Sequence, residues 1–337
     1  MSRVDVIVPC YRYAHYLRGC VESVLTQSVT DVRILIIDDA SPDNTAEVAE
    51  ELVARDSRVQ FRKHEVNRGH IATYNEGLDW VEGDFTVLLS ADDLLAPGSL
   101  SRALHLFDSH PKVGLVYGKG ILFRAEPPPW IGPVPEHCGW KILEGTEFLE
   151  SCCSDGVNPV CTPTAITRTR LQKQLGGYRK DLPHSGDMEM WMRFAAHSQV
   201  GILDADQAYY RLHEVNMSRA YYASPLADWK QRQEAFATVF REQGMAVAES
   251  VRLEQKSNLS LAWAAFWEAN KAFEVGDPDR CQELLDFALE LDPGLVKRSE
   301  YTRLRWKRRA GREVWSAIRP MIQLVRGRPT LAQNPPA

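Results

Sequence analysis

The chain has 337 residues, of which 44% are hydrophobic and 25% are charged, and its formal net charge at pH 7 is −5. This is the composition of an ordinary globular protein, and it lacks the basic excess that would favour a nucleic-acid partner. Seven cysteines occur without any C-x-x-C pair, so neither a zinc site of that kind nor a redox motif is indicated, and a reducing compartment is expected.

The first strand pattern begins at Val4, which leaves no room for a signal peptide, and no apolar run approaches the roughly 20 residues needed to span a bilayer. Both observations predict a cytoplasmic protein.

The first hundred residues alternate strand-like and helix-like patterns with short polar connections between them. Strands are expected at Val4–Pro9, Val32–Ile37, Val59–Arg62 and Phe85–Leu89, and helices at Tyr16–Gln27, Ala46–Ala54 and Ile71–Trp80. This series predicts an α/β fold with a parallel sheet covered by helices on both faces. Polar residues that follow the strands should then meet at one edge of the sheet.

From about Val113 the pattern becomes irregular and rich in proline. The loop Phe123–Trp140 is expected to tune the substrate pocket. Further elements are expected as helices at Gly145–Ser151, Arg168–Leu175 and Asp187–His197, and as short strands at Ala165–Thr167 and Val200–Leu203. These strands are too few for an independent fold, so residues 1–225 are expected to form one domain with a nucleotide half and an acceptor half.

After residue 225 the pattern is almost entirely helical. Residues 226–295 are expected to form a helical extension that contains one tetratricopeptide-like helix pair, with its turn at Gly276-Asp277-Pro278. Residues 296–337 form a basic tail with interleaved Trp306 and Trp315, and its end from Pro329 is expected to be disordered. This tail either lies on anionic lipid at the inner face of a membrane or packs on the domain as a solvated helix.

Asp92 and Asp93 follow directly on an apolar strand pattern and precede an apolar stretch with Pro97 and Gly98. Two adjacent carboxylates repel each other unless a cation lies beside them, and Mg²⁺ or Mn²⁺ is the usual divalent ion with oxygen and phosphate ligands. The alternative interpretation is an acidic cap for the helix that begins near Ser99.

Other polar residues also follow predicted strands. The stretch Val8-Pro9-Cys10-Tyr11-Arg12 has no glycine, which disfavours a dinucleotide fold or a phosphate loop, so a nucleotide would be held by side chains and a metal. Asp39 can accept hydrogen bonds from a base or ribose, or it caps the next helix. Arg68 is a candidate phosphate or base partner, and Asn75 lies nearby; a turn and a helix interior are the alternative explanations.

Asp187 opens a helix with an apolar face, which would fix its carboxylate at a rigid, partly enclosed position. The helix dipole should keep this carboxylate ionised, as suits a general base; a plain helix cap is the alternative. His213 is expected in a polar loop after a strand, where it could ligate a metal, contact phosphate, or simply lie at the surface.

Seven of these segments resemble, in the same order, the motifs of family 2 glycosyltransferases over about residues 3–220. They are Val6-Ile7-Val8-Pro9-Cys10-Tyr11-Arg12, Ile37-Asp38-Asp39-Ala40-Ser41-Pro42-Asp43-Asn44-Thr45, Asn67-Arg68-Gly69, Asn75-Glu76-Gly77-Leu78, the Asp92-Asp93 strand end, Gly176-Gly177-Tyr178 with Gly186-Asp187-Met188-Glu189-Met190-Trp191-Met192-Arg193, and Arg211-Leu212-His213 with Asn216-Met217-Ser218. The resemblance implies a GT-A type nucleotide-binding sheet flanked by helices, followed here by the α-helical extension.

The same resemblance implies inverting, metal-dependent hexosyl transfer from a nucleoside-diphosphate sugar, with a UDP-sugar as the leading donor, to a glycan or lipid-linked acceptor in cell-surface glycan, polysaccharide or glycoconjugate synthesis. By position it makes Asp187 the catalytic base, and Asp93 with His213 the ligands of Mn²⁺ or Mg²⁺. It places six residues at the nucleotide sugar: Pro9, Tyr11, Asp39 at the base, Arg68, Asn75, and Asp92 near the ribose.

One departure from the family pattern is Ser90, where many members have Asp. Two alternatives stay open. A sugar nucleotidylyltransferase has a similar architecture but needs a basic, glycine-rich loop after the first strand. A non-catalytic GT-A-like scaffold would act through the helical extension, and Asp93→Asn would leave its partner binding intact.

Overall fold

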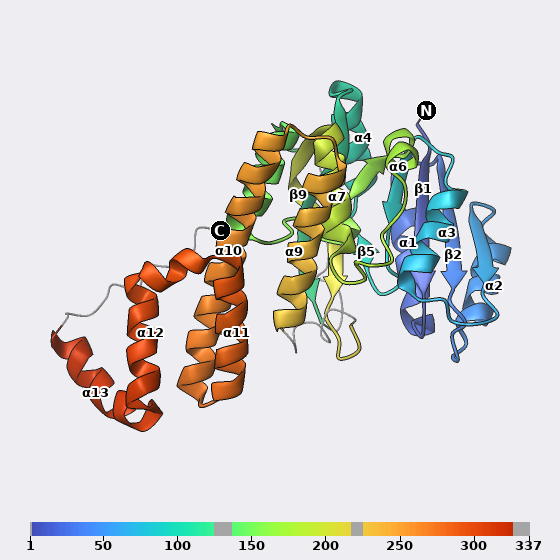
Figure 1. The fold of residues 1–337 in the computed structure, drawn as a ribbon. Coiled ribbons are helices and arrows are strands. Elements are labelled where there is room, and N and C mark those ends of the chain that lie inside the picture. Colours follow the sequence, from blue (N-terminus) through green and yellow to red (C-terminus); the bar gives the residue numbers. More distant parts are fainter. Residues whose placement is uncertain (1, 125–136, 217–224, 326–337) are drawn as a thin grey trace. The chain divides into compact units, whose positions relative to one another are not determined.

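The computed structural model describes residues 2–124, 137–216 and 225–325 (Figure 1). The chain divides into two compact units, residues 1–257 and 258–337. The boundary between the units falls inside the long helix α10 (Val247–Val275). The tuning role expected for the Phe123–Trp140 loop falls largely on residues outside the described ranges.

Within the described residues, one nine-stranded sheet forms the frame of the first unit. Its strands are β1 (Val4–Cys10), β2 (Val32–Asp38), β3 (Val59–Lys63), β4 (Phe85–Leu88), β5 (Leu94–Leu95), β6 (Val113–Phe123), β7 (Trp140–Leu143), β8 (Ile166–Arg168) and β9 (Gln199–Arg211). The strand order is β3-β2-β1-β4-β8-β6-β9-β5, and β7 pairs with β9.

The α/β class predicted from the sequence is confirmed, but the sheet is mixed. Strands β3, β2, β1 and β4 are parallel, as expected. Strand β8 then runs antiparallel to both β4 and β6, and β5 and β7 run antiparallel to β9. The βαβ pattern therefore describes the first half of the sheet only.

Strand β6 was not predicted, because Gly114, Gly118 and Gly120 interrupt its apolar pattern. The structure gives a reason for a glycine in the middle of this strand. A Cβ at Gly118 would lie 2.6 Å from Cγ of Gln207 and 2.9 Å from the carbonyl oxygen of Ala205. The register between β6 and β9 shifts at this point, so the glycine allows the close approach of the irregular β9 backbone.

Helices cover both faces of the sheet (Figure 1). In the first unit they are α1 (Ala14–Leu25), α2 (Thr45–Arg55), α3 (His70–Trp80), α4 (Ser99–Ser109), α5 (Gly145–Asp155), α6 (Thr169–Leu175), α7 (Gly186–His197) and α9 (Pro225–Glu242), with a short 3₁₀ turn, η1 (Thr162–Thr164).

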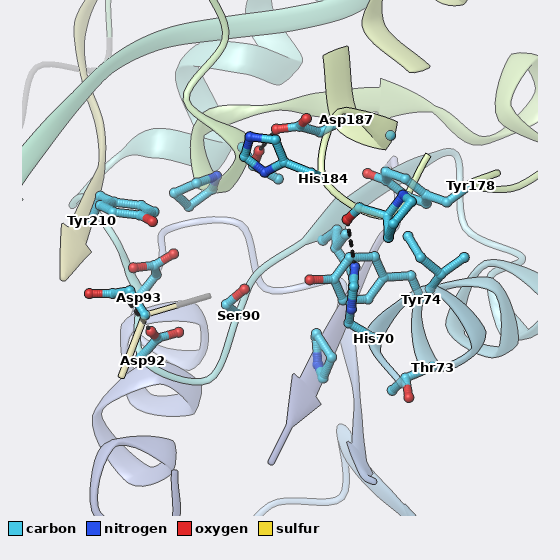
Figure 2. A pocket seen from close by; sticks show the side chains of 18 of the residues that line it. His70, Thr73, Tyr74, Ser90, Asp92, Asp93, Tyr178, His184, Asp187 and Tyr210 are labelled. Carbon is cyan, nitrogen blue, oxygen red and sulfur yellow. Dashed lines mark hydrogen bonds between the residues drawn. The ribbon is translucent and has the colours of Figure 1, made fainter. Parts of the chain in front are cut away.

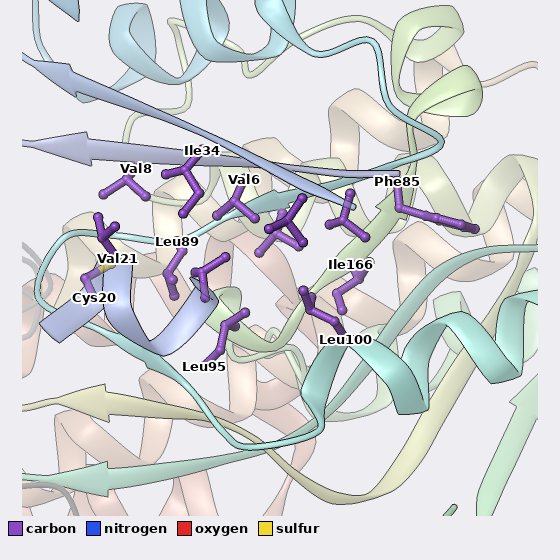
Figure 3. Close-up of a cluster of buried hydrophobic side chains, with 14 of the residues drawn as sticks. Val6, Val8, Cys20, Val21, Ile34, Phe85, Leu89, Leu95, Leu100 and Ile166 are labelled. Carbon is purple, nitrogen blue, oxygen red and sulfur yellow. The ribbon is translucent and has the colours of Figure 1, made fainter. Parts of the chain in front are cut away.

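The main hydrophobic core lies between the sheet and helices α1 and α4 (Figure 3). Val6 and Val8 of β1 and Ile34 of β2 face Val21 of α1 and Leu100 of α4, and all five are fully buried. On the opposite face, α3 approaches β1 closely, because a Cβ at Gly77 would lie 2.3 Å from Cγ2 of Ile7. Tight packing on both faces fixes the strand ends that carry the polar residues.

The second unit continues α10 and adds α11 (Pro278–Leu291), the 3₁₀ turn η2 (Pro293–Lys297), α12 (Ser299–Ala310) and α13 (Arg312–Val325). The helix pair expected around Gly276 is present as α10 and α11. Gly276 has φ +88°, and the Asp277 carboxylate accepts a hydrogen bond from the Arg280 amide to cap α11.

The predicted basic tail is helical as far as Val325, and its expected disordered end lies outside the described residues. Lys307 of α12 donates to Asn270 (2.8 Å) and Glu274 (3.2 Å) of α10 and lies over the Trp315 ring of α13. Across the described part of the chain, every helix is too short or too polar to cross a bilayer.

Candidate active site

A cleft of about 1110 Å³ opens at the carboxyl ends of β1, β2 and β4. Six of the predicted site residues line it: Pro9, Tyr11, Asp39, Asp92, Asp93 and Asp187. Figure 2 shows Asp92 and Asp93 on one side of the cleft and Asp187 with His184 on the other. The fold thus places the two predicted acidic sites in one cavity, whereas Arg68, Asn75 and His213 are not among the residues that line this cavity.

Asp92 and Asp93 are both buried, with 6% and 3% of their surfaces exposed. The Asp93 carboxylate accepts a hydrogen bond from the Arg211 amide (2.9 Å). Burial, and then repulsion from Asp92, raise the pKa of Asp93 well above its usual range. The two adjacent carboxylates of this pair therefore destabilise the folded protein in the absence of a cation.

Strand β9 and the residues after it hold this acidic pair in place. The Arg211 guanidinium donates to the Asp92 carbonyl (2.9 Å) and is stacked over the rings of Tyr16 and Phe123, at 4.1 and 4.4 Å. His213 lies 2.9 Å from the Asp92 carboxylate through Nε2, while its buried Nδ1 has no hydrogen-bond partner among the residues that the structure describes. Sequence reasoning quoted Arg211 within a motif but assigned no role to it.

The residues present fit a divalent cation only together with a ligand. Asp92 and Asp93 offer carboxylate oxygens to the cleft, and their mutual repulsion is what a cation relieves. Over the described ranges, no group of three or more His, Cys, Asp or Glu side chains is placed to hold a metal ion. His213 bonds to Asp92 instead. Mg²⁺ and Mn²⁺ commonly complete their coordination with phosphate oxygens and water.

Asp39 lies at the end of β2 in a cradle of donors. Its carboxylate accepts hydrogen bonds from the amides of Arg68 (2.7 Å) and Gly69 (2.8 Å), and His64 Nδ1 lies 2.7 Å from it. His64 also lies 3.0 Å from Glu76 of α3. The sequence signal for His64 was available, because this residue lies two positions after the predicted strand Val59–Arg62 and directly after β3.

Arg68 and Asn75 have structural partners instead of facing the cleft. The Arg68 guanidinium donates to Glu76 (2.7 Å), and it is the backbone amide of Arg68 that supports Asp39. The Asn75 side-chain amide donates to the Tyr178 carbonyl (2.9 Å) and accepts from the Tyr178 amide (2.7 Å). Asn75 therefore ties α3 to the loop that leads to Asp187.

Asp187 is positioned by the first turn of α7 and by three hydrogen-bond donors. Its carboxylate accepts from the Met188 amide (2.7 Å), the Thr162 hydroxyl (2.9 Å) and the Asn158 side-chain amide (3.2 Å). The two side-chain donors lie in irregular segments around η1, where the sequence offered no signal. One edge of Asp187 remains open to the cleft.

The expectation that the helix dipole alone sets the ionisation of Asp187 was incomplete. Burial raises the pKa of Asp187 above its ordinary value, against the lowering effects of Thr162, the Met188 amide and the charge of His184. The prediction from sequence included the helix N-terminus but not desolvation. A raised pKa makes a carboxylate a stronger base, which favours proton abstraction.

Residues 5–166 match the family model described as glycosyl transferase family 2. This segment of the chain belongs to that family. The family 2 resemblance seen in the sequence is therefore confirmed.

Curated relatives are also glycosyltransferases. The putative glycosyltransferase EpsE of Bacillus subtilis is 26% identical over 219 residues, which cover 63% of this chain and 73% of EpsE. An uncharacterized glycosyltransferase of Nostoc sp. is 31% identical over 120 residues, which cover 36% of this chain and 37% of that protein. The match thus spans well under half of the Nostoc relative.

Two solved structures resemble the fold of this family 2 protein. S. aureus TarS 1–349 in complex with UDP-GlcNAc has a TM-score of 0.63 at 18% identity and covers 97% of this chain and 93% of TarS 1–349. The mannosyltransferase PcManGT of Pyrobaculum calidifontis, in complex with GDP-Man and Mn²⁺, has a TM-score of 0.52 at 17% identity, with coverages of 88% and 87%. At these identities the likeness shows the GT-A type fold.

Proposed function

We propose that this family 2 glycosyltransferase transfers a hexosyl group from a UDP-sugar to an acceptor hydroxyl with inversion at the anomeric carbon. The observation that carries the proposal is the placement of two acidic sites in one cleft, with the Asp92–Asp93 pair on one side and Asp187 on the other (Figure 2). Such a cleft can hold a diphosphate at the first site and a hydroxyl at the second.

On the donor side, Asp93, assisted by Asp92, would hold Mn²⁺ or Mg²⁺ against the diphosphate, and His213 would orient Asp92. When bound, the cation neutralises the charge that develops on the leaving diphosphate. Asp39 accepts hydrogen bonds from the base, while Pro9 and Tyr11 line the same end of the cleft. The UDP-GlcNAc complex of TarS and the GDP-Man and Mn²⁺ complex of PcManGT support this class of donor and metal.

On the acceptor side, Asp187 takes the proton of the acceptor hydroxyl while the hydroxyl oxygen attacks the anomeric carbon. The bond between that carbon and the diphosphate oxygen breaks on the opposite face, so one displacement inverts the configuration. Thr162 and Asn158 hold the carboxylate in one orientation, and each donates to the same oxygen, Oδ2. Fixing the base in this way lowers the entropic cost of the attack.

The acceptor we propose is a growing cell-surface glycan or a lipid-linked intermediate, with residues 1–225 acting as the transferase, 226–295 as a helical extension and 296–337 as a membrane-facing tail. Trp306 is 64% exposed on α12, and Arg303, Arg305 and Arg309 are exposed on the same helix. Basic helices with exposed tryptophan bind anionic lipid surfaces. This supports a protein that works at the inner face of a membrane.

The experiment that tests the donor side is calorimetry of UDP, GDP, dTDP and CDP binding, each with and without Mn²⁺. Metal-dependent binding of UDP above the other nucleotides is the expected result, and it would justify a screen of UDP-sugars. Preference for another nucleotide would change the donor class, while binding of none of the four would contradict the proposal and direct attention to Ser90.

A further inference from the structure

A cluster of charged side chains lies in the cleft wall next to Asp187. It consists of His184, which precedes α7, and of Asp228 and Arg232 from α9, and all three line the cleft. Helix α9 follows the segment that matches the family model. The nucleotide-sugar chemistry described above gives this cluster no role.

Helix α9 holds His184 at both its backbone and its ring. The Asp228 carboxylate lies 2.6 Å from His184 Nε2, and the His184 amide donates to the Gln231 side chain (3.4 Å). Asp228 itself is 5% exposed, and Arg232 binds both of its oxygens, at 3.0 and 2.6 Å. Arg232 also donates to the Gly156 carbonyl (3.2 Å), so the whole cluster is fixed.

His184 faces the carboxylate of Asp187, the residue that we propose as the base (Figure 2). The charge of His184 lowers the pKa of Asp187, against the stronger effect of burial. The negative charge of Asp187 also contributes to the raised pKa of three neighbouring groups, Cys161, Tyr178 and Tyr74. These neutral groups give no help to an ionised Asp187.

We propose that His184 is a positioning residue: held by Asp228, its imidazole lies beside Asp187 and keeps the base ionised inside the cleft. Asp228 acts through His184, because its carboxylate holds the imidazole ring in place (2.6 Å). This inference rests on the proposed role of Asp187. It makes α9 part of the acceptor-side machinery of the enzyme.

The competing explanation is that the cluster only attaches α9 to the domain. The two explanations differ in the ionisation of Asp187, which a purely structural tie would leave unchanged. That ionisation can be followed without any substrate, by ¹³C NMR of the full chain labelled at the aspartate Cγ. The Asp187 signal is assigned as the one missing in Asp187→Asn.

The expected result is an upward shift of the Asp187 titration midpoint by about one unit in His184→Gln, with a smaller upward shift in Asp228→Asn. A glutamine at position 184 can still donate a hydrogen bond to Asp228. The His184→Gln variant alone therefore suffices for the test if Asp228→Asn fails to fold. His197→Gln is the control. His197 lies on α7, the helix of Asp187, but it pairs with Gln243 (2.9 Å) and does not line the cleft. It should leave the midpoint unchanged.

An unchanged midpoint in a folded His184→Gln variant overturns the inference, as does an equal shift in His197→Gln. Once a donor is known, the acid limb of the kcat/KM profile should move to higher pH by the same amount in His184→Gln. A failure of the proposed function would be seen differently. If Asp187 is not the base, Asp187→Asn would retain sugar transfer, whatever change it causes in the NMR spectrum.

Discussion

Asp93 combines near-complete burial with an acidic neighbour, and its raised pKa reports the cost of both. Proteins retain such unfavourable charges where a bound ligand relieves them. The supporting contacts from Arg211 and His213 act on this pair and therefore fix its geometry.

We predict that Asp93→Asn lowers sugar transfer at least 100-fold and removes the metal dependence of UDP binding, while the protein stays folded. An asparagine oxygen can still accept from the Arg211 amide, and repulsion from Asp92 disappears, so the thermal unfolding temperature should be unchanged or raised. A transfer assay and calorimetry with Mn²⁺ measure the loss of function, and a thermal melt measures stability.

Asp204→Asn is the matched control for this substitution, because Asp204 is an exposed carboxylate whose partner is Lys119 (2.6 Å). It should alter neither quantity. A folded Asp93→Asn variant with normal turnover would exclude the metal role. Intact partner binding in Asp93→Asn, with no turnover in the native chain, would instead fit the scaffold alternative.

Asp5 shows the opposite electrostatic case at the start of β1. Its fully buried carboxylate accepts from Arg33 (2.8 and 2.5 Å) and from the amides of Glu82 and Gly83 (both 2.7 Å). Burial alone would raise its pKa, but these donors, Arg33 first, bring the pKa below its ordinary value. The network joins the amino-terminal ends of β1, β2 and β4, opposite the cleft.

We predict that Asp5→Asn costs about 3 kcal/mol of unfolding free energy at pH 7, because Arg33 loses its buried partner. A carboxylate with a lowered folded-state pKa stabilises the protein above its unfolded pKa of about 4, and this contribution disappears as the pH falls through the lower folded value. The difference between variant and native protein should therefore shrink below about pH 4 in urea titrations.

The control for Asp5 is Asp31→Asn, which breaks the exposed pair with Arg3 (3.4 Å) and should cost well under about 1 kcal/mol. A constant difference between Asp5→Asn and the native protein from pH 7 to pH 3 would mean that the charge of Asp5 contributes nothing to stability.

At the scale of elements, the site depends on how α3 holds the loop between α6 and α7. Asn75 binds both backbone groups of Tyr178, and Gly177 lies directly against it. A Cβ at Gly177 would come within 2.4 Å of the Asn75 side-chain oxygen. This contact couples a helix of the nucleotide half to the segment that presents Asp187.

We predict that Gly177→Ala lowers kcat about tenfold or more and leaves UDP binding intact, because the displaced loop moves Asp187 but not the Asp92–Asp93 pair. Steady-state kinetics and UDP calorimetry separate the two effects. Gly139→Ala is the control, since the nearest atom to its Cβ is at an ordinary 3.8 Å.

The double variant Asn75→Ala with Gly177→Ala provides a second check, because truncating Asn75 makes room for the new methyl group. The double variant should lose less activity than the sum of the single losses. If the two single losses of activity simply add in the double variant, Gly177→Ala does not act through the contact with Asn75.

At the scale of the molecule, the sequence predicted the elements whose signal is local. The strands around Val6, Ile34 and Val87 are continuous apolar runs that helices bury on both sides, and they lie where the pattern places them. The acidic residues after them reached a common cleft because parallel strands end at one edge. Asp39, Asp92, Asp93 and Asp187 follow from this rule together with the family motifs.

What the sequence could not predict depends on contacts between distant segments. Strand β6 was not predicted because contacts with distant segments require its glycines, such as the contact of Gly118 with the β9 backbone at Ala205, 87 residues later. Asn75 was assigned to the substrate because its partner, Tyr178, lies 103 residues away. His184 carried no signal, since Asp228 and Gln231 of α9, which contact it, lie 44 and 47 residues later in the chain. Side-chain partners across the fold are thus the information that local patterns lack.

The charge of the whole chain hides a strong asymmetry. The net charge is −5, yet Lys297–Arg328 carries eleven basic and two acidic residues. On α12, the exposed Arg305, Trp306 and Arg309 are neighbours in sequence or one helical turn apart. A transferase with a lipid-linked acceptor benefits from such a surface, because membrane binding concentrates enzyme and acceptor in one layer.

We predict that reversing Arg305 and Arg309 to glutamate lowers partitioning of the full chain to phosphatidylserine vesicles at least 30-fold, from about 1 kcal/mol lost per basic residue. Trp306→Ala should cost less, added salt should weaken binding by the native chain, and neutral phosphatidylcholine vesicles should bind it poorly. The matched control reverses Arg170 and Lys180, two exposed basic residues of the first unit. Sedimentation with vesicles distinguishes the outcomes. An equal loss of binding in the control variant would mean that net charge drives association. Undiminished binding by the α12 variant would mean that its basic surface does not face a membrane.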